Sequence, residues 1–181
     1  TFKHTSWFSM GSDIADVNND GRTDLLTVDM SATNHYLSKV MMGSMSTHAY
    51  FLDTAEPRQY MRNFLHLNAG KTDSAPTHKP KPRFLETGQL SGISSTNWSW
   101  APVMRDFDAD GHVDLFVTNG HVRNFNNPDV GTDKTETQTK KTYWDIHKGE
   151  KPMPQVNKTF HNLDGTHFAP IGEKWGLDHL G

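Results

Sequence analysis

Two short acidic loops constrain this chain more than any other feature of its sequence. Residues 106–114 read DFDADGHVD, and residues 16–24 read DVNNDGRTD. In both copies, oxygen-bearing side chains occupy positions one, three, five and nine, and a glycine occupies position six. Alternate side chains of a tight loop can point inward, and the glycine permits the sharp reversal that brings the later positions round one ion.

This spacing predicts a calcium ion in each loop, because that hard cation takes about six to eight oxygen ligands at flexible geometry. The expected ligands are Asp16, Asn18, Asp20, Arg22 and Asp24 in the first loop, and Asp106, Asp108, Asp110, His112 and Asp114 in the second. Arg22 and His112 are included only for their main-chain carbonyls. The second loop has four carboxylates where the first has three and an amide, so we expect it to bind the ion more tightly.

An EF-hand loop begins in the same way, but it needs a bidentate Glu at position twelve and a helix on either side. Position twelve is Thr27 in the first loop and Val117 in the second. The residues that follow each loop, LLTV and LFVT, are β-branched and apolar, which is typical of a buried strand. Each loop is therefore predicted to join two strands. The alternative is a surface turn rich in Asp and Gly that binds nothing.

The loops belong to a longer internal repeat. A shift of ninety positions superimposes both loops, and a second match follows downstream, between RFLETGQLSGI and HFAPIGEKWGL, with Asn68 matching Asn162. The repeating unit is strand, loop, strand, insertion, strand, hairpin, strand. Four strands per unit is the composition of a propeller blade.

The segments SWFSMGSDIADVNNDGRTDLLTVDM and GQLSGISSTNWSWAPVMRDFDADGHVDLFVTNG resemble the FG-GAP or VCBS repeat, the calcium-loop blade of integrin-α-like β-propellers. The chain looks like the large secreted bacterial VCBS-repeat proteins of the ASPIC/UnbV-associated type. The resemblance covers most of the chain apart from two polar insertions. It implies a calcium-binding module that is secreted or displayed at the cell surface.

We therefore expect an all-β fold: about two four-stranded blades of a larger integrin-α-like β-propeller, with helical or irregular insertions. Residues 1–94 are assigned to the first blade, with loop 16–24 and insertion 31–62, and residues 95–181 to the second, with loop 106–114 and insertion 123–155. The chain opens in the middle of a blade and ends where another repeat would begin. We expect an interior fragment that needs further blades or other subunits for stability.

The insertions differ in character. Tyr36, Leu37, Val40, Met41 and Met45 follow near-helical spacing, which predicts one or two short helices in the first insertion. The second insertion is polar, and its aromatic run YWDI, at residues 143–146, is expected to anchor it.

Composition excludes several classes of function. The formal net charge is −3, so no bulk attraction to nucleic acid or to an anionic membrane is expected. There is no cysteine, which excludes disulfides and thiolate sites, and no apolar run approaches the roughly 18 residues of a membrane span. Motifs of nucleophilic catalysis and of nucleotide binding are absent. A pair of glycosidase-type carboxylates stays open, because any two acids can meet in the fold.

The histidines and tryptophans allow functional and structural interpretations. His112 and His121 have no partner at metal-ligand spacing, while His66, His161 and His167 are expected to be half-exposed strand residues. Trp98 and Trp100 alternate along one predicted strand. They can form either a sugar-stacking platform or part of the core between blades, and the second interpretation is favoured.

Two hypotheses of function follow. The first is a non-catalytic, calcium-stabilised extracellular module for adhesion, surface assembly or binding of a protein or glycan ligand. The second is the scaffold or carbohydrate-binding part of a secreted polysaccharide-active enzyme. Other subunits that complete the propeller are the alternative partners. In the first hypothesis the binding surface lies on the insertions, since loops on a rigid scaffold commonly carry function.

Overall fold

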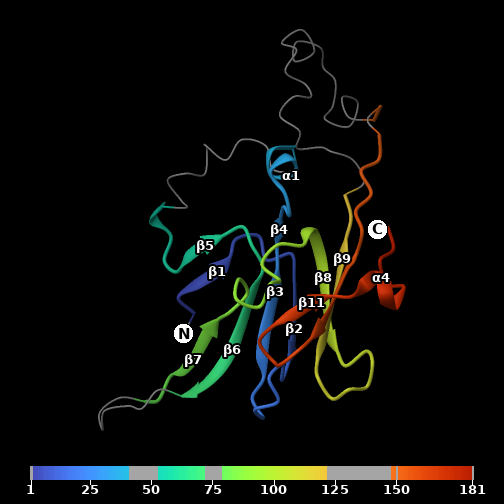
Figure 1. The fold of residues 1–181 in the computed structure, drawn as a ribbon. Helices are drawn as coiled ribbons and strands as arrows, with labels where there is room; N and C mark the ends of the chain where they lie inside the picture. The colour runs from blue at the N-terminus through green and yellow to red at the C-terminus, as the bar shows by residue number, and fades with distance from the viewer. Residues whose placement is uncertain (1, 41–52, 72–78, 122–147, 150, 181) are drawn as a thin grey trace.

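The computed structural model describes residues 2–40, 53–71, 79–121, 148–149 and 151–180, and these residues form a predominantly β structure (Figure 1). This confirms the predicted predominance of strands. The described residues form three sheets and do not make up a closed propeller. The predicted anchor at 143–146, residues 41–52 of the first insertion and most of the second insertion lie outside the described residues.

Both predicted units form four-stranded antiparallel sheets whose strands follow chain order. The first contains β2 (Gly11–Ala15), β3 (Asp24–Val28), β6 (Phe64–Lys71) and β7 (Pro82–Glu86). The second contains β8 (Asn97–Arg105), β9 (Asp114–Asn119), β10 (Lys158–Asn162) and β11 (Phe168–Pro170). We call these sheets unit one and unit two.

Two short pairings complete the sheets. β4 (Met30–Ser31) continues the chain beyond β3 and pairs with the start of β8, so unit one supplies a fifth strand to the sheet of unit two. β1 (His4–Ser6) pairs in parallel with β5 (Arg58–Tyr60) in a separate two-stranded sheet.

The register shows how closely the units correspond. Leu25 in β3 lies opposite His66 in β6, and its counterpart Leu115 in β9 lies opposite Phe160 in β10. His66 and Phe160 are therefore equivalent, and Asn68 and Asn162 each lie two positions beyond them, as the predicted match of these two residues requires.

Helices are short in the described residues. α1 (His35–Val40) lies in the first insertion, as the spacing of Tyr36, Leu37 and Val40 predicts. α4 (Gly172–Trp175) follows β11 and ends at Gly176, whose left-handed φ of 68° reverses the chain. No helix among the described residues has the length and hydropathy that a membrane crossing requires.

The two sheets pack against each other around one apolar core. Unit one contributes Val17, Leu26, Val28, Leu65 and Leu67, and unit two contributes Met104, Leu115, Val117, Phe160 and Phe168, with Ile93 between them. Burying each of these large side chains contributes about 1.5–3 kcal/mol. The core therefore fixes how the two loops sit relative to each other.

Three expectations about individual side chains are wrong. His167 lies in the hairpin between β10 and β11 rather than in a strand. His66 is 3% exposed rather than half-exposed, because Phe2 packs over its ring with centroids 4.4 Å apart. Trp98 is buried as expected, whereas Trp100 is 47% exposed. The register of β8 shifts between Ser99 and Pro102, which breaks the simple alternation on which the prediction for Trp100 rested.

Candidate metal centres in the two loops

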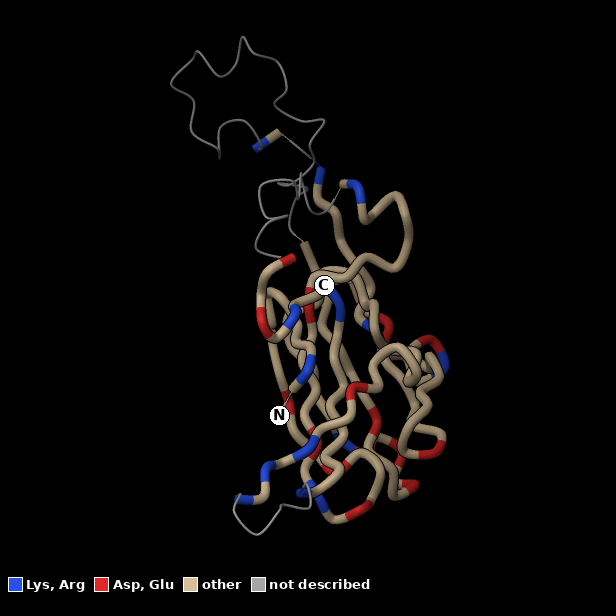
Figure 2. Tube along the Cα trace, turned by 90° about the vertical axis from the view of Figure 1, so that its left-hand side faces the viewer, with Lys and Arg blue, Asp and Glu red and all other residues tan. Residues whose placement is uncertain are grey.

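Both acidic loops lie at the same end of the molecule, at the bottom of Figure 1, where β2 turns into β3 and β8 turns into β9. Acidic residues recur at this lower end in Figure 2. The loops touch, because the side-chain amide of Asn19 donates a hydrogen bond of 3.0 Å to the carbonyl oxygen of Gly111.

The first loop is built on its own carboxylates. The two oxygens of Asp16 accept hydrogen bonds from the main-chain N–H groups of Asp20 and Gly21, at 3.0 and 2.7 Å. Asp20 accepts one from the N–H of Arg22 at 2.9 Å. These contacts fold positions one to seven into a tight turn with the carboxylates close together.

The second loop repeats this frame. Asp106 accepts from the N–H groups of Asp110 and Gly111, at 3.1 and 2.9 Å, and Asp110 accepts from His112 at 2.8 Å. The left-handed backbone is repeated as well. Position four has φ of 55° at Asn19 and 62° at Ala109, and position six has φ of 80° at Gly21 and 89° at Gly111.

The ninth-position carboxylate closes each loop and ties it to the third strand of its unit. Asp24 accepts hydrogen bonds from the N–H groups of Val17 and Asn68, at 2.9 and 2.7 Å. Asp114 accepts from Phe107 and Asn162, at 3.0 and 2.9 Å. Both carboxylates are fully buried.

Burial raises the pKa of Asp24 above its usual value, against the opposing effect of the hydrogen bonds from Asn68 and Val17. The acids Asp20 and Asp16 add to the upward shift. A carboxylate held in such surroundings favours a nearby cation, because the cation's charge offsets both the loss of hydration and the repulsion between acids.

The structure brings the predicted ligands of the second loop together in two overlapping groups. Asp106, Asp108 and Asp114 each place a carboxylate oxygen within 4.8 Å of the others. Asp108 and Asp110 do the same with a ring nitrogen of His161. Both groups can hold a metal ion, and Asp108 belongs to both.

The first loop is arranged differently. Among the described residues, Asp16, Asp20 and Asp24 do not form such a group. The guanidinium of Arg22 bonds the carboxylate of Asp20 and donates through Nε to the carbonyl of Asn68 at 2.6 Å, so it holds Asp20 to one side. The side-chain oxygen of Asn18, a predicted ligand, is buried without a hydrogen-bond partner. A cation at this position would satisfy it.

Sequence reasoning missed His161. Its Nε2 lies 3.0 Å from an oxygen of Asp110 and 3.5 Å from one of Asp108. The hydrogen bond with Asp110 raises the pKa of His161 and lowers the pKa of Asp110. The match of Asn68 with Asn162 pairs His161 with Leu67, but it gives no signal that either residue lies beside a loop.

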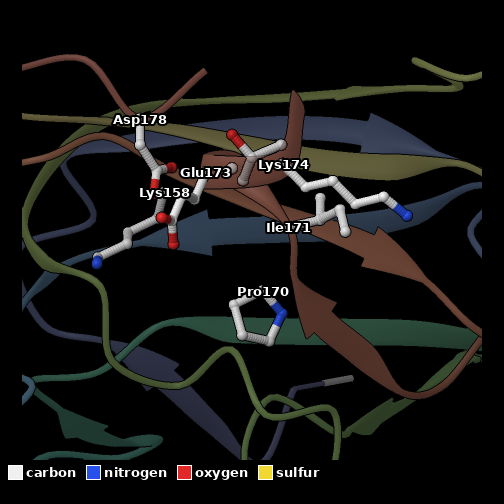
Figure 3. Close-up of a pocket in the computed structure, with 8 residues that line it drawn as sticks. Lys158, Pro170, Ile171, Glu173, Lys174 and Asp178 are labelled. Carbon is white, nitrogen blue, oxygen red and sulfur yellow. The ribbon is translucent and has the colours of Figure 1, made fainter. Parts of the chain in front are cut away.

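A pocket of about 500 Å³ lies away from the loops, between β10, β11 and α4. Figure 3 shows Lys158, Glu173 and Asp178 on its wall, with Lys174 extending in another direction. The wall combines two basic and two acidic side chains, so it has no strong preference for a charged ligand of either sign. The acidic loops are the better candidate site.

Comparison of the chain with protein-family models, with curated proteins and with solved structures gives no match. The geometry of the loops is therefore the basis for a functional assignment.

Proposed function

We propose that the protein is a calcium-stabilised β-propeller-type module, non-catalytic and extracellular, that serves adhesion, surface assembly or ligand binding. The observation that carries the proposal is the repetition of one carboxylate frame in two loops that join equivalent strands. The repeated frame places carboxylates at positions one, five and nine of both loops, which supplies oxygen ligands of the kind that a bound cation requires.

Calcium fits the ligands that the loops present. The group Asp106, Asp108 and Asp114 is made of oxygens only, which suits a hard cation. The partnerless oxygen of Asn18 offers the equivalent third-position ligand in the first loop. Extracellular calcium modules typically bind at about 10⁻⁴–10⁻³ M, so such loops would be filled outside the cell.

The propeller part of the proposal rests on which face of each sheet is covered. Leu26 and Val28 of unit one point into the shared core, whereas the core residues of unit two, Leu115 and Val117, match Leu25 and Thr27. Each unit therefore packs against the other through one face of its sheet, and the face that unit one uses does not correspond to the face that unit two uses. Such head-to-tail packing repeats from blade to blade and leaves one open face at each end.

The open faces are visible in the exposure of matching residues. Val17 is fully buried by unit two, while its counterpart Phe107 is 41% exposed. Conversely, Met104 is buried by unit one, while its counterpart Ile14 is 59% exposed. A further blade on each side would cover both apolar side chains.

The proposal is tested by calorimetric calcium titration of the whole chain, with Asp20→Ala and Asp110→Ala as variants. We expect wild type to bind two ions and each variant to lose one, with a melting temperature several degrees lower at saturating calcium, because the ions stabilise the folded state. If neither substitution changes binding or stability, the loops are ordinary turns and the proposal fails.

A second candidate function is a carbohydrate-binding scaffold of a polysaccharide-active enzyme, and exposed Trp100 favours it. Its indole N–H donates to the carbonyl of Gly120 at 2.7 Å, which fixes the ring while nearly half of the residue remains exposed. Rigid exposed aromatic faces suit ligand contact because little conformational entropy is lost. Glycan-array binding that disappears in Trp100→Ala would support this candidate. Unchanged binding would remove it.

A further inference from the structure

His161 distinguishes the second loop from the first. It lies in β10 and reaches back to the carboxylates of Asp108 and Asp110. The register of the two units puts Leu67 at the equivalent place in β6, where it belongs to the apolar core. The first loop therefore has no imidazole at this position.

The distances suit a shared ion. Zinc binds imidazole nitrogen and carboxylate oxygen at about 2.0–2.2 Å, so two ligands of one ion at tetrahedral or octahedral angles lie about 3.0–3.4 Å apart. The Nε2 of His161 is 3.0 Å from Asp110 and 3.5 Å from Asp108. Both distances from Nε2 are close to ligand spacing, and the three ligand atoms all lie within 4.8 Å of one another.

The imidazole also has a second contact. The ring of Trp175, at the end of α4, packs edge-on against the ring of His161 with centroids 5.7 Å apart. This contact limits the positions that the ring can adopt. Trp175 and Asp108 also line a small pocket of about 370 Å³ with Phe107 and Leu177, so the group lies at an accessible surface.

We propose that Asp108, Asp110 and His161 form a site for a nitrogen-accepting divalent cation of the Zn²⁺ type, which the first loop cannot form. Imidazole is a good ligand for zinc and its neighbours in the first transition row, whereas calcium prefers oxygen alone. The proposal rests on the cation-binding role of the loops. It adds that only the second loop offers a nitrogen-containing site beside its all-oxygen group, and that the two groups share Asp108.

The test is Zn²⁺ titration by calorimetry on the whole chain, comparing wild type with His161→Leu and His161→Gln. Leucine is the residue that unit one has at this position, and glutamine keeps a polar oxygen but removes the nitrogen. We expect both variants to weaken Zn²⁺ binding more than about tenfold, since even loss of an outer partner of a metal ligand costs about 10–100-fold.

His167→Leu is the matched control. His167 contacts a carboxylate of Asp164 at 2.7 Å in the hairpin between β10 and β11, and within the described part of the chain it belongs to no group that could hold a metal ion. Its replacement should leave the Zn²⁺ isotherm unchanged. If His167→Leu weakens Zn²⁺ binding as much as His161→Leu does, the binding is non-selective and the inference is overturned.

A calcium titration of the same variants separates this inference from the proposed function. Unchanged calcium binding in His161→Leu and His161→Gln supports a zinc-specific role of the imidazole. Equal losses of calcium and zinc binding would show that His161 only supports the loop, and unchanged zinc binding would show that its contact with the acids is a simple ion pair. Both results overturn the inference. If wild type binds zinc through His161 but no calcium, the calcium proposal fails while the inference stands.

Discussion

At the scale of the residue, the left-handed positions of the loops carry a definite conformational cost. Gly111 has φ of 89°, and a Cβ added there would meet no atom within 4 Å. Replacement by alanine would therefore strain the backbone but would cause no steric clash. An L-residue in this region loses about 1–2 kcal/mol relative to glycine.

Gly111→Ala should therefore lower the free energy of unfolding by about 1–2 kcal/mol, measured by urea denaturation in the presence of a chelator. Gly111→Asn should lower the free energy of unfolding by less, since Asn tolerates the left-handed region and already occupies it at Asn19. Equal losses for the two variants would show that the position is limited by something other than φ.

His66 gives a pH dependence whose sign follows from its burial. Desolvation lowers the pKa of the folded His66, with Arg62 acting in the same direction and Glu86 against it. In the unfolded chain His66 takes up a proton near its ordinary pKa of about 6.5. The unfolded state thus binds more protons below that pH, and the folded state loses stability as pH falls through and below about 6.5.

His66→Phe removes this proton uptake by the unfolded state. A phenylalanine, Phe160, already occupies the equivalent position in unit two. We expect the unfolding free energy of the variant to fall less steeply than that of wild type between pH 7.5 and 5.5, measured by chemical denaturation with chelator present. The ring neighbours Phe2 and Phe84 should accept the substitution. Parallel pH profiles would contradict the prediction.

At the scale of the element, β10 connects the two loops through one side chain. The amide nitrogen of Asn162 donates to the carbonyls of Val17 and Val113, at 2.9 and 3.0 Å. Its side-chain oxygen accepts from Gly165 at 2.7 Å. Val17 lies in the first loop and Val113 in the second, so a single residue braces both.

Asn162→Ala should consequently weaken calcium binding at both loops. Leaving buried polar partners unsatisfied costs about 1–3 kcal/mol. Asn68→Ala is the matched variant, because Asn68 donates to Thr23 of the first loop and accepts from Gly70 of its own strand. It should affect the first site only. Two-site titrations of both variants test the difference, and an effect of Asn162→Ala confined to the second loop would contradict it.

The sequence predicts these elements well where the information is local. The loop spacing, the apolar runs that follow it and the helix at Tyr36, Leu37 and Val40 are all encoded within a few residues, and the strands and helix appear where expected. Each unit also forms the four strands in the predicted order.

Contacts that depend on the pairing of distant strands were not predictable from pattern alone. His161 meets Asp110 only because β10 pairs with β9 in one register, and the long second insertion leaves that register unspecified in the sequence. His66 is buried because the N-terminal Phe2 folds back over it, which no periodicity of β6 indicates.

At the scale of the whole molecule, the packing leaves complementary surfaces at the two ends. In unit two the face that carries Phe107 is open. The matching face of unit one, which carries Val17, is covered by unit two. In unit one the face that carries Ile14 is open. The matching face of unit two, which carries Met104, is covered by unit one. A second copy of the chain can therefore dock head-to-tail, as the next blade would.

Such contacts do not close on themselves after two copies, so they favour concentration-dependent association rather than a single dimer. We expect the isolated chain to self-associate in sedimentation velocity, and Phe107→Ser or Ile14→Ser to reduce the weight-average sedimentation coefficient at high concentration. Tyr36→Ser is the control, since Tyr36 is an exposed aromatic residue on α1, outside both open faces. A monomeric wild-type chain that melts cooperatively would show that two units suffice for a stable fold, because the open faces would then need no cover.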